Sequence, residues 1–301
     1  MEFEQSATYI IITPAYNEEA LIKRTIQSMI AQTIRPLLWI IVNDGSTDRT
    51  SHIVRQYATH QRFIRLIDIE RRQTRGFANK AAAFNRGLAE ARKYSYQYIG
   101  NLDADIVLEP CYFEGILSEF EKDPMLGIAG GIVFTNINGK FFTTDETIDS
   151  VGGAVQLFRR ACLDAVGGYL PLQHGGIDAA AEINAKMLGW KVRKFPNYKV
   201  FEQRRTGSAQ ARPLRAKVRE GRRFHSLGYG VLFFLARCVY RINDPPFLIG
   251  SIAALYGFME SLIVGRPILL PSNVVAYLRT EQMKRLKRLT TYLTRYKTKN
   301  E

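Results

Sequence analysis

Residues 37–48 read LLWIIVNDGSTD, an apolar run that stops at a loop of Asn, Asp, Gly and hydroxyl residues. A short apolar run bounded by turn residues is typical of a strand buried inside a sheet. The same pattern recurs at residues 9–19, YIIITPAYNEE, and at residues 96–105, YQYIGNLDAD. Helix-period segments separate the three runs, and this alternation predicts a doubly wound α/β sheet.

The alternation of helical and extended periods continues to about residue 200. The expected strands are residues 9–13, 37–43, 63–67, 96–102 and 126–134. Four of the expected helices are residues 18–32, 79–93, 110–122 and 179–188. A further helix follows the second strand; Ser46 or Asp48 would cap its start, and it would end at Tyr57. The sequence has no internal repeat and no low-complexity segment.

The composition is that of an ordinary globular protein. The 301 residues are 46% hydrophobic and 23% charged, which excludes wholesale disorder, a collagen-like chain and a multi-span membrane protein. Cys111, Cys162 and Cys238 lie far apart in the sequence, so we expect neither a disulfide framework nor a zinc site. This use of cysteine suits a protein of the reducing cytosol. The N-terminal MEFEQSATYIII carries acids where a signal peptide needs positive charge, so we expect no export.

Positive charge is concentrated in the last third of the chain. Residues 202–301 contain 19 Lys and Arg against 6 Asp and Glu, a net charge of +13, which leaves +1 of the total +14 for residues 1–201. A basic region of this kind attracts nucleic acid or an anionic membrane surface. The residues between the charges must therefore be used to distinguish nucleic acid from a membrane surface as the partner.

Within this basic region lies an apolar run, residues 247–264, FLIGSIAALYGFMESLIV, whose single charge is Glu260. Arg237, Arg241 and Arg266 flank it. Spanning a bilayer takes roughly 20 apolar residues, so we expect helices that lie in the interface of an anionic membrane. A helical subdomain packed on the body of the protein is the alternative. Nucleic acid is not an expected partner, because a long apolar run would interrupt the basic surface.

Acidic loops follow the first, second and fourth expected strands: PAYNEE, NDGSTD and DAD. Each alone could be a helix N-terminus, a capped turn or a solvated loop. Together they should meet in one crevice, because ligands of open α/β sheets bind outside the carboxyl ends of the strands. Grouped carboxylates need a compensating cation, and Mg²⁺ or Mn²⁺ shared with a ligand's phosphates would supply it. The absence of GxGxxG and GxxxxGK[ST] motifs excludes a dinucleotide site and a P-loop.

Five segments in this order carry a family resemblance: TPAYNEE at 13–19, NDGSTD at 43–48, GFANKAAAFNRG at 76–87, LDADI at 102–106 and GGAVQLFRRACLDAVGGY at 152–169. Over residues 8–205 the chain resembles the family-2 inverting glycosyltransferases of GT-A fold. The resemblance implies an α/β GT-A domain at residues 1–205, followed by a basic, mostly helical, membrane-associating region at 206–301. The tail resembles that of bacterial envelope-polysaccharide transferases.

The implied activity is transfer of a sugar, with inversion, from a nucleotide-diphosphate sugar to a glycan or polyprenyl-linked acceptor. The implied location is the cytoplasmic face of the inner or plasma membrane, as a peripheral or monotopic protein. A sugar-1-phosphate nucleotidyltransferase is an alternative, although it would want a basic, Gly-rich loop after the first strand. A catalytically inactive homologue acting as a scaffold is another.

The resemblance also assigns roles to residues of this sequence. The residues implied in nucleotide-sugar binding are Thr13, Pro14, Ala15, Tyr16, Glu18, Asp44, Arg75, Gly76, Asn79, Lys80, Asp103 and Ala104. The implied Mg²⁺ or Mn²⁺ ligands are Asp105 and Asp103, with Asp105 the usual ligand of such a motif. Gly153, Ala154 and Arg204 are implied on the acceptor side.

An inverting transfer also needs one carboxylate to take the acceptor's proton. Family members supply it as the Asp of a Glu-Asp pair that opens a helix, and Asp178 matches that position. Ile177 replaces the Glu, so Asp178 could instead be only a helix cap, and Glu182 is the substitute candidate.

The sequence departs from the family near residues 201–207, FEQRRTG, where relatives often carry a His. Glu202 and His174 are therefore possible third metal ligands. The QxxRW motif of processive synthases is also incomplete, because it lacks the Trp, and a processive enzyme is not expected.

Overall fold

The computed structural model describes residues 7–70, 77–137, 139–143, 147–204 and 213–297. The chain forms two compact units. The N-terminal unit comprises Met1–Gln173 and Ile177–Thr206, and the C-terminal unit comprises His174–Gly176 and Gly207–Glu301. Each unit is described by itself.

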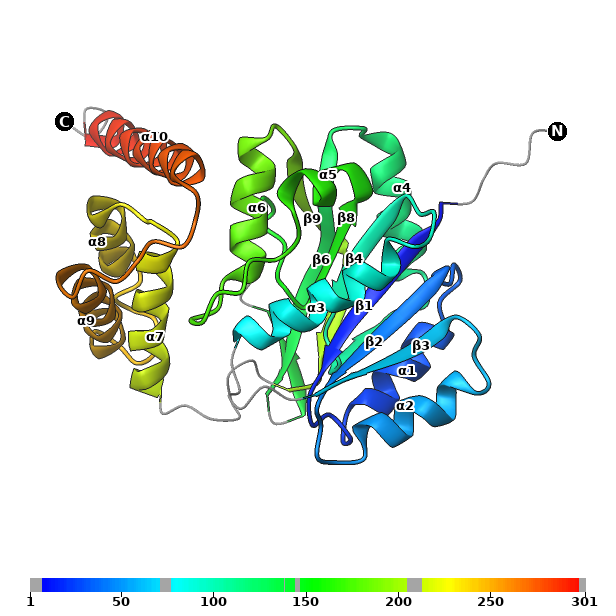
Figure 1. The fold of residues 1–301 in the computed structure, drawn as a ribbon. Helices are drawn as coiled ribbons and strands as arrows, with labels where there is room; N and C mark the ends of the chain where they lie inside the picture. The colour runs from blue at the N-terminus through cyan, green and yellow to red at the C-terminus, as the bar shows by residue number, and fades with distance from the viewer. Residues whose placement is uncertain (1–6, 71–76, 138, 144–146, 205–212, 298–301) are drawn as a thin grey trace. The chain divides into compact units, whose positions relative to one another are not determined.

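The N-terminal unit is built on a nine-stranded sheet whose first half is parallel (Figure 1). The strands of this half pair in the order β3-β2-β1-β4. Their bounds are β1 (Tyr9–Ala15), β2 (Leu38–Asp44), β3 (Ile64–Ile69) and β4 (Tyr98–Leu102). Parallel neighbours bring the loops after β1, β2 and β4 to the same edge of the sheet, as the sequence predicts.

The second half of the sheet is mixed, continuing β4-β8-β6-β9-β5, with β7 paired to β6. Its strands are β5 (Ile106–Leu108), β6 (Leu126–Ile137), β7 (Lys140–Phe142), β8 (Val155–Arg159) and β9 (Lys191–Glu202). β8 is antiparallel to β4 and β6, and β5 is antiparallel to β9. The predicted α/β Rossmann-like GT-A fold is confirmed, although the doubly wound parallel pattern holds only for the first half.

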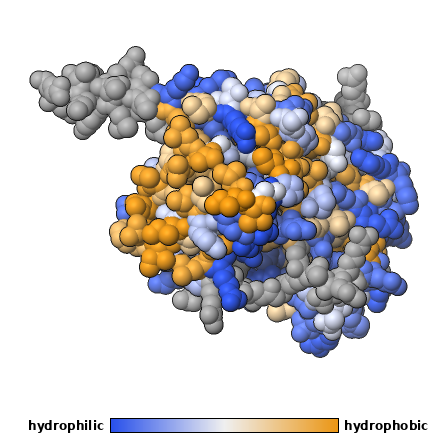
Figure 2. Space-filling model, turned by 60° about the vertical axis from the view of Figure 1, so that its left-hand side comes forward, coloured by the Kyte–Doolittle hydropathy of each residue, from blue (hydrophilic) through white to orange (hydrophobic). Residues whose placement is uncertain are grey.

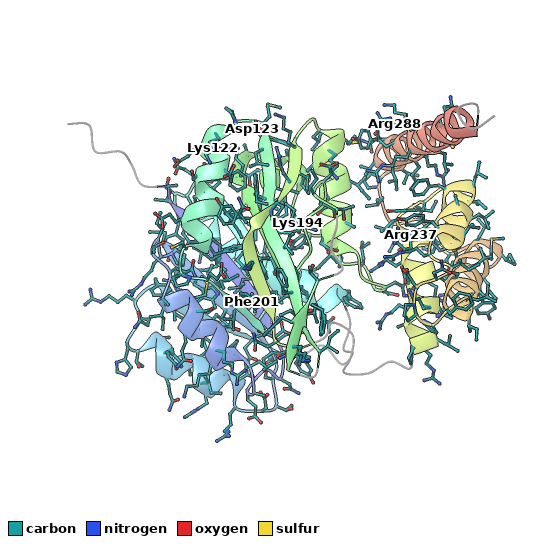
Figure 3. The ribbon with its side chains drawn as sticks, turned by 180° about the vertical axis from the view of Figure 1, so that it is seen from behind. Lys122, Asp123, Lys194, Phe201, Arg237 and Arg288 are labelled. Atoms are coloured by element: carbon teal, nitrogen blue, oxygen red, sulfur yellow. The ribbon has the colours of Figure 1, made fainter. Side chains whose placement is uncertain are left out.

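The short connection between β4 and β5 shows how the sheet curls. Residues 103–105 alone separate the two strands in sequence, yet β4 lies in the middle of the strand order and β5 at its end. On the intervening β9, Phe201 contacts the rings of Phe134 and Phe141 at centroid distances of 5.9 and 5.2 Å (Figure 3). The acidic loop DAD therefore lies where the β5 end of the sheet curls back toward the middle strand β4.

The helices of this unit are α1 (Ile22–Ile30), α2 (Thr50–Ala58), α3 (Phe77–Ala91), α4 (Tyr112–Lys122), α5 (Arg160–Val166) and α6 (Ile177–Met187). The helix expected from residue 18 begins only at Ile22, because the preceding residues are turned by hydrogen bonds to the loop after β2. Gly87 lets α3 pack closely on the sheet, since a Cβ there would lie 2.6 Å from Ile12 Cγ2.

The C-terminal unit is helical, as predicted for residues 206–301. Its helices are α7 (Pro213–Ser226), α8 (Val231–Tyr240), α9 (Ile249–Ile263) and α10 (Ser272–Lys297). α7 and α9 pack backbone against backbone, because a Cβ on Gly221 would lie 1.9 Å from the Ala254 carbonyl oxygen. Phe234 stacks on Phe258 beside this contact, with ring centroids 4.4 Å apart. Among the described helices, none is both long enough and apolar enough to cross a membrane.

A buried polar network joins α6 to the segment before β8. The Glu182 carboxylate accepts hydrogen bonds from Ser150 Oγ at 2.9 Å, Val151 N at 2.6 Å and Gln156 Nε2 at 3.2 Å. Burial raises the pKa of Glu182 to about 7. The Glu182 carboxyl therefore stabilises the N-terminal unit, whereas the sequence analysis considered it as a substitute catalytic base.

The elevated pKa of Glu182 predicts a pH-dependent stability. The folded chain binds this proton more tightly than the unfolded chain, so the unfolding free energy should fall as pH rises from about 4.5 to about 7. The loss should be on the order of 3 kcal/mol. Gln can accept the hydrogen bonds of Val151 and Gln156 with its oxygen and donate its amide to Ser150 Oγ, all without ionising, so Glu182→Gln should match the wild type at pH 5 and exceed its stability at pH 8.

Urea unfolding followed by tryptophan fluorescence measures this effect, because both tryptophans, Trp39 and Trp190, belong to the N-terminal unit. The matched control is Glu121→Gln on the exposed side of α4, which should leave the pH profile unchanged. Parallel pH profiles for wild type and Glu182→Gln would contradict the prediction.

Candidate functional site

The loops after β1 and β2 are held together by hydrogen bonds from backbone N–H groups to side-chain oxygens. The N–H of Asn17 donates to Ser46 Oγ at 3.0 Å, and the N–H of Glu18 donates to Thr50 Oγ1 at 2.8 Å. In return, the N–H of Thr47 donates to Asn17 Oδ1 at 2.8 Å. Asn17 adopts a left-handed backbone conformation with φ of 53°, which suits Asn better than most residues. The two loops thus form one wall.

Two acids of these loops are used to build the wall. Asp48 Oδ2 accepts the N–H of Glu19 at 3.0 Å, and Asp48 Oδ1 accepts the N–H of Thr50, the first residue of α2, at 2.9 Å. Glu19 Oε2 accepts the N–H of Arg49 at 3.0 Å. Asp48, and not Ser46, is therefore the side chain that satisfies the start of α2.

The DAD loop is anchored on three sides. The carbonyl of Ala104 accepts a hydrogen bond from Thr25 Oγ1 of α1 at 2.7 Å. The carbonyl of Asp105 accepts the N–H of Gln203 at 2.9 Å, and the N–H of Asp103 donates to the carbonyl of Ala154 at 2.9 Å. The backbone positions of both aspartates are consequently fixed by α1, by the end of β9 and by the start of β8.

Asp105 lies in a crowded acidic environment. It is only 8% exposed, and Arg204 Nη2 lies 3.3 Å from its Oδ2 and 2.6 Å from Glu18 Oε1. Burial, followed by repulsion from Asp103 and Glu18, raises the pKa of Asp105 to about 7 despite the nearby guanidinium. Glu202, also buried, adds to this repulsion. Additional positive charge would therefore stabilise the ionised form of Asp105.

A second chain of contacts links Asp103 to α6. Lys80 Nζ lies 2.6 Å from Asp103 Oδ1, and Asn101 Nδ2 donates to Asp103 Oδ1 at 3.0 Å and to the carbonyl of Gly153 at 2.7 Å. The N–H of Gly153 donates to Asp178 Oδ2 at 3.0 Å. Burial disfavours the charged lysine, but Asp103 outweighs burial and raises the pKa of Lys80. Asp103 and Asp178 are thus coupled through one glycine.

The structure brings several predicted site residues into these two chains of contacts: Glu18, Asp105 and Arg204 in the first, and Lys80, Asp103, Gly153 and Asp178 in the second. Pro14, Ala15 and Tyr16 end β1 or follow it, Asp44 ends β2, and Asn79 lies in the first turn of α3. Thr13 lies inside the core instead: it is fully buried, and its Oγ1 accepts a hydrogen bond from Trp39 Nε1 at 2.9 Å. The Thr13 side chain therefore belongs to the core of the sheet that carries the site.

Other predicted residues have different surroundings from those expected. Arg75 and Gly76 lie outside the described residues. Arg204, expected on the acceptor side, contacts the acids Glu18 and Asp105. His174 lies within the C-terminal unit, where burial and then Arg222 and Arg266 lower its pKa.

The sequence analysis missed the role of Asn101. Its amide bridges Asp103 and Gly153, and the residue is almost completely buried within β4. The available signal was an amide at the end of an otherwise apolar buried strand, where a polar group requires a partner. Thr25, which anchors Ala104 from α1, gave no comparable signal.

The acids of the site suit a hard divalent cation. Within the described parts of the chain, no group of three or more His, Cys, Asp or Glu side chains is arranged to hold a metal ion alone. Mg²⁺ is commonly bound by one or two carboxylates together with substrate phosphates. Asp105 and Asp103 fit that arrangement, because Asp105 is buried among like charges that Arg204 does not offset.

Comparison with known proteins identifies the family. Residues 10–174 match the model of glycosyl transferase family 2. Among curated relatives, poly-beta-1,6-N-acetyl-D-glucosamine synthase of Staphylococcus epidermidis is 29% identical over 188 residues, which cover 55% of this chain and 43% of that protein. Chondroitin synthase of Escherichia coli is 35% identical over 146 residues, which cover 48% of this chain and 18% of that protein. The chain spans less than half of the length of these relatives.

Solved structures share the fold over a larger part of the chain. The mannosyltransferase PcManGT from Pyrobaculum calidifontis, in complex with GDP-Man and Mn²⁺, has a TM-score of 0.55 at 20% identity, covering 95% of this chain and 83% of that one. TarS 1–349 of S. aureus, in complex with UDP-GlcNAc, has a TM-score of 0.53 at 15% identity, covering 84% and 71%. The family model matches residues 10–174, which are more than half of the 301-residue chain, and the protein therefore belongs to glycosyl transferase family 2.

Proposed function

We propose that this enzyme transfers a sugar, with inversion, from a nucleotide-diphosphate sugar to a hydroxyl of a glycan or polyprenyl-linked acceptor. The observation that carries the proposal is the buried Asp105, held among like charges where the ends of β1, β4 and β9 meet. Membership in glycosyl transferase family 2 supports the reaction class. The curated relatives named as polysaccharide synthases support a glycan as the acceptor.

The wall formed by the first two loops is the proposed donor-binding surface. Asp44 would contact the base or ribose, together with Pro14, Ala15 and Tyr16. Lys80, fixed beside Asp103, would place its charge next to the donor diphosphate. Asn79 precedes it in the first turn of α3, where backbone N–H groups favour an anion.

Asp105 and Asp103 are the proposed ligands of Mg²⁺ or Mn²⁺. When bound, this ion would neutralise charge on the diphosphate leaving group. Arg204 contacts both Asp105 and Glu18, so it would hold the two acids in position beside the donor. Glu202 is the proposed further acid of this site, since it lies close enough to raise the pKa of Asp105.

Asp178 is the proposed general base on the acceptor side. It lies in the first turn of α6, after Gly175 and Gly176, both with left-handed backbone conformations. Its Oδ2 is oriented by the N–H of Gly153, so Oδ1 would take the proton of the acceptor hydroxyl. Ala154, next to Gly153, would line the acceptor side with it.

The geometry disfavours a sugar-1-phosphate nucleotidyltransferase. That reaction needs backbone N–H groups or basic side chains after β1 to hold a triphosphate. Here the N–H groups of Asn17, Glu18 and Glu19 already donate to the second loop. An inactive scaffold is the remaining alternative, and it predicts neither donor binding nor turnover.

The proposed place of action is the cytoplasmic face of the membrane, as a peripheral or monotopic protein. The concentration of positive charge in residues 202–301 supports it, because anionic lipids attract such a region.

Thermal-shift screening of UDP-, GDP- and dTDP-sugars with Mn²⁺ tests donor binding. A ligand at one hundred times its Kd should add about 2.7 kcal/mol of stability. Hydrolysis of the same panel then tests turnover. No stabilisation by any donor would support the scaffold alternative.

Asp105→Asn should remove nearly all transfer and the metal-dependent part of donor binding. The neutral amide cannot balance a divalent cation, and the loss of several kcal/mol of transition-state stabilisation corresponds to a decrease of about a hundredfold or more in kcat. Donor titrations with and without Mn²⁺, together with a sugar-transfer assay, measure both effects.

The control is Asp123→Asn, a surface acid paired with Lys191 at the end of α4 (Figure 3). It should retain activity. Full wild-type activity in excess chelator would argue against the proposed metal.

Asp178→Asn should lower kcat by about 10²–10⁴-fold, the usual contribution of a general base. Donor affinity should stay near the wild-type value, because the donor-side residues are unchanged. Steady-state kinetics at saturating donor, combined with direct donor titration, separate the two parameters. Glu182→Gln is the comparison variant, and it should retain most turnover because its hydrogen bonds are structural. The opposite ranking of the two variants would assign the base to Glu182.

A further inference from the structure

The C-terminal unit carries an apolar helix that is only half covered. One side of α9 packs on α7 and α8 through Ala254 and Phe258, which are buried. The other side remains exposed: Tyr256 is 61% and Ile263 79% accessible, and Ile252 is exposed on the same side. A helix that is apolar on all sides is normally buried in a core or in lipid. The outer side of α9 therefore lacks the environment that its composition requires.

α8 and the segment before α9 extend this surface. On α8, Leu232, Leu235 and Val239 follow the spacing of one helix face and are all exposed. Tyr240 and Phe247, also exposed, lie between that face and the start of α9. We call the whole set the apolar face: Leu232, Leu235, Val239, Tyr240, Phe247, Ile249, Ile252, Tyr256, Ile263 and Val264. Figure 2 shows hydrophobic residues gathered on this unit.

Exposed apolar residues scattered singly need no explanation, but a gathered set marks an interaction surface. The apolar face joins two helices and the segment between them, and Leu262 and Leu248 at the ends of α9 are also exposed. The partner must therefore offer a broad apolar environment and not a pocket for one side chain.

Cations surround a single carboxylate between α7 and α8. Glu220 of α7 lies 3.2 Å from Lys217, 4.0 Å from Arg223, 3.8 Å from Arg237 and 3.7 Å from Arg241. Arg241 also pairs with Asp244 at 3.0 Å. Four cations thus share two acids, so the cluster retains positive charge.

This cluster is held in place by the packing of the unit. The guanidinium of Arg237 lies over the ring of Phe224 at 4.7 Å (Figure 3). Arg237 lies on α8, and Arg241 directly follows the last residue of that helix. In the sequence, each arginine is two residues from the exposed Val239. Helix geometry places Arg237 and Arg241 on the side of α8 that faces α7, and Val239 with Leu232 and Leu235 on the opposite, exposed side.

We infer that the apolar face docks onto the surface of an anionic lipid bilayer. The exposed side chains of α8 and α9 would enter the acyl boundary, and Arg237, Arg241 and Lys217 would contact lipid phosphates. A second copy of the chain is a poorer occupant, because pairing through the apolar face would leave the net positive charge of both clusters uncompensated. The inference goes beyond the proposed function in naming a surface, and its test requires no enzymatic activity.

Vesicle sedimentation of the full chain tests the inference. The probes are vesicles of pure phosphatidylcholine and vesicles with about one third phosphatidylglycerol. Each cation at an anionic surface strengthens binding about fivefold, so the wild type should bind the anionic vesicles far more tightly, and less so as salt rises. Ile252→Ser combined with Tyr256→Ser should weaken binding to anionic vesicles more than tenfold.

Matched controls test each half of the surface. Leu37→Ser with Met125→Ser makes the same kind of change at exposed apolar residues of the N-terminal unit and should leave binding unchanged. Arg241→Gln with Lys217→Gln should weaken binding about twentyfold on anionic vesicles, whereas Lys122→Gln with Lys23→Gln should not. Circular dichroism and melting temperature verify folding of every variant.

An independent readout avoids dependence on loss-of-binding variants. Tyr256→Trp places a fluorophore on the apolar face, and its emission should shift to shorter wavelength on anionic vesicles. Equal binding to neutral and anionic vesicles, or no emission shift at saturation, would overturn the inference. Self-association that the Ile252→Ser, Tyr256→Ser variant abolishes would assign the face to a second copy instead.

Discussion

Repulsion between buried carboxylates is the constraint on which the N-terminal unit depends. Asp105 is held by its backbone close to Asp103 and Glu18, and its pKa rises to about 7 as a result of burial and this repulsion. Such an arrangement costs stability, so the surrounding structure must prevent the acids from separating. Hydrogen bonds from Thr25 and from the end of β9 fix the loop, and Arg204 reduces the repulsion without removing it. The remaining demand for positive charge suits a site that binds a cation together with a diphosphate.

The acids of the loops divide into two groups with different tasks. Asp48 and Glu19 are used in joining the first two loops, and Glu182 is used in joining α6 to the segment before β8. These carboxylates accept backbone N–H groups and act as parts of the framework. Asp178 instead accepts the N–H of Gly153, and the Asn101 amide joins the carbonyl of the same glycine to Asp103. Under the proposed function, this turn connects the donor-side acid Asp103 to the acceptor-side acid Asp178.

The C-terminal unit solves a different physical problem. Its small core is built from aromatic rings and from close packing of α7 on α9, which Gly221 and Gly257 permit. Four helices cannot enclose all of the apolar side chains that the unit contains, so one side of α9 stays exposed. Cations gather around Glu220 between the neighbouring helices α7 and α8. An environment that is both apolar and anionic would satisfy both features at once.

The sequence alone determined the parallel half of the sheet and the positions of its acidic loops. Short, β-branched runs such as LLWIIVN, bounded by turn residues, favour buried strands, and acids that follow parallel strands lie at one edge of the sheet. The mixed half was not foreseen, because the position of β5 beside β9 depends on pairing between residues far apart in sequence. The same reason applies to the side chains. Thr13 faces the core, Arg204 joins the acids, and Glu182 is buried; burial and pairing of this kind are decided by tertiary packing, which residue type and local spacing do not specify.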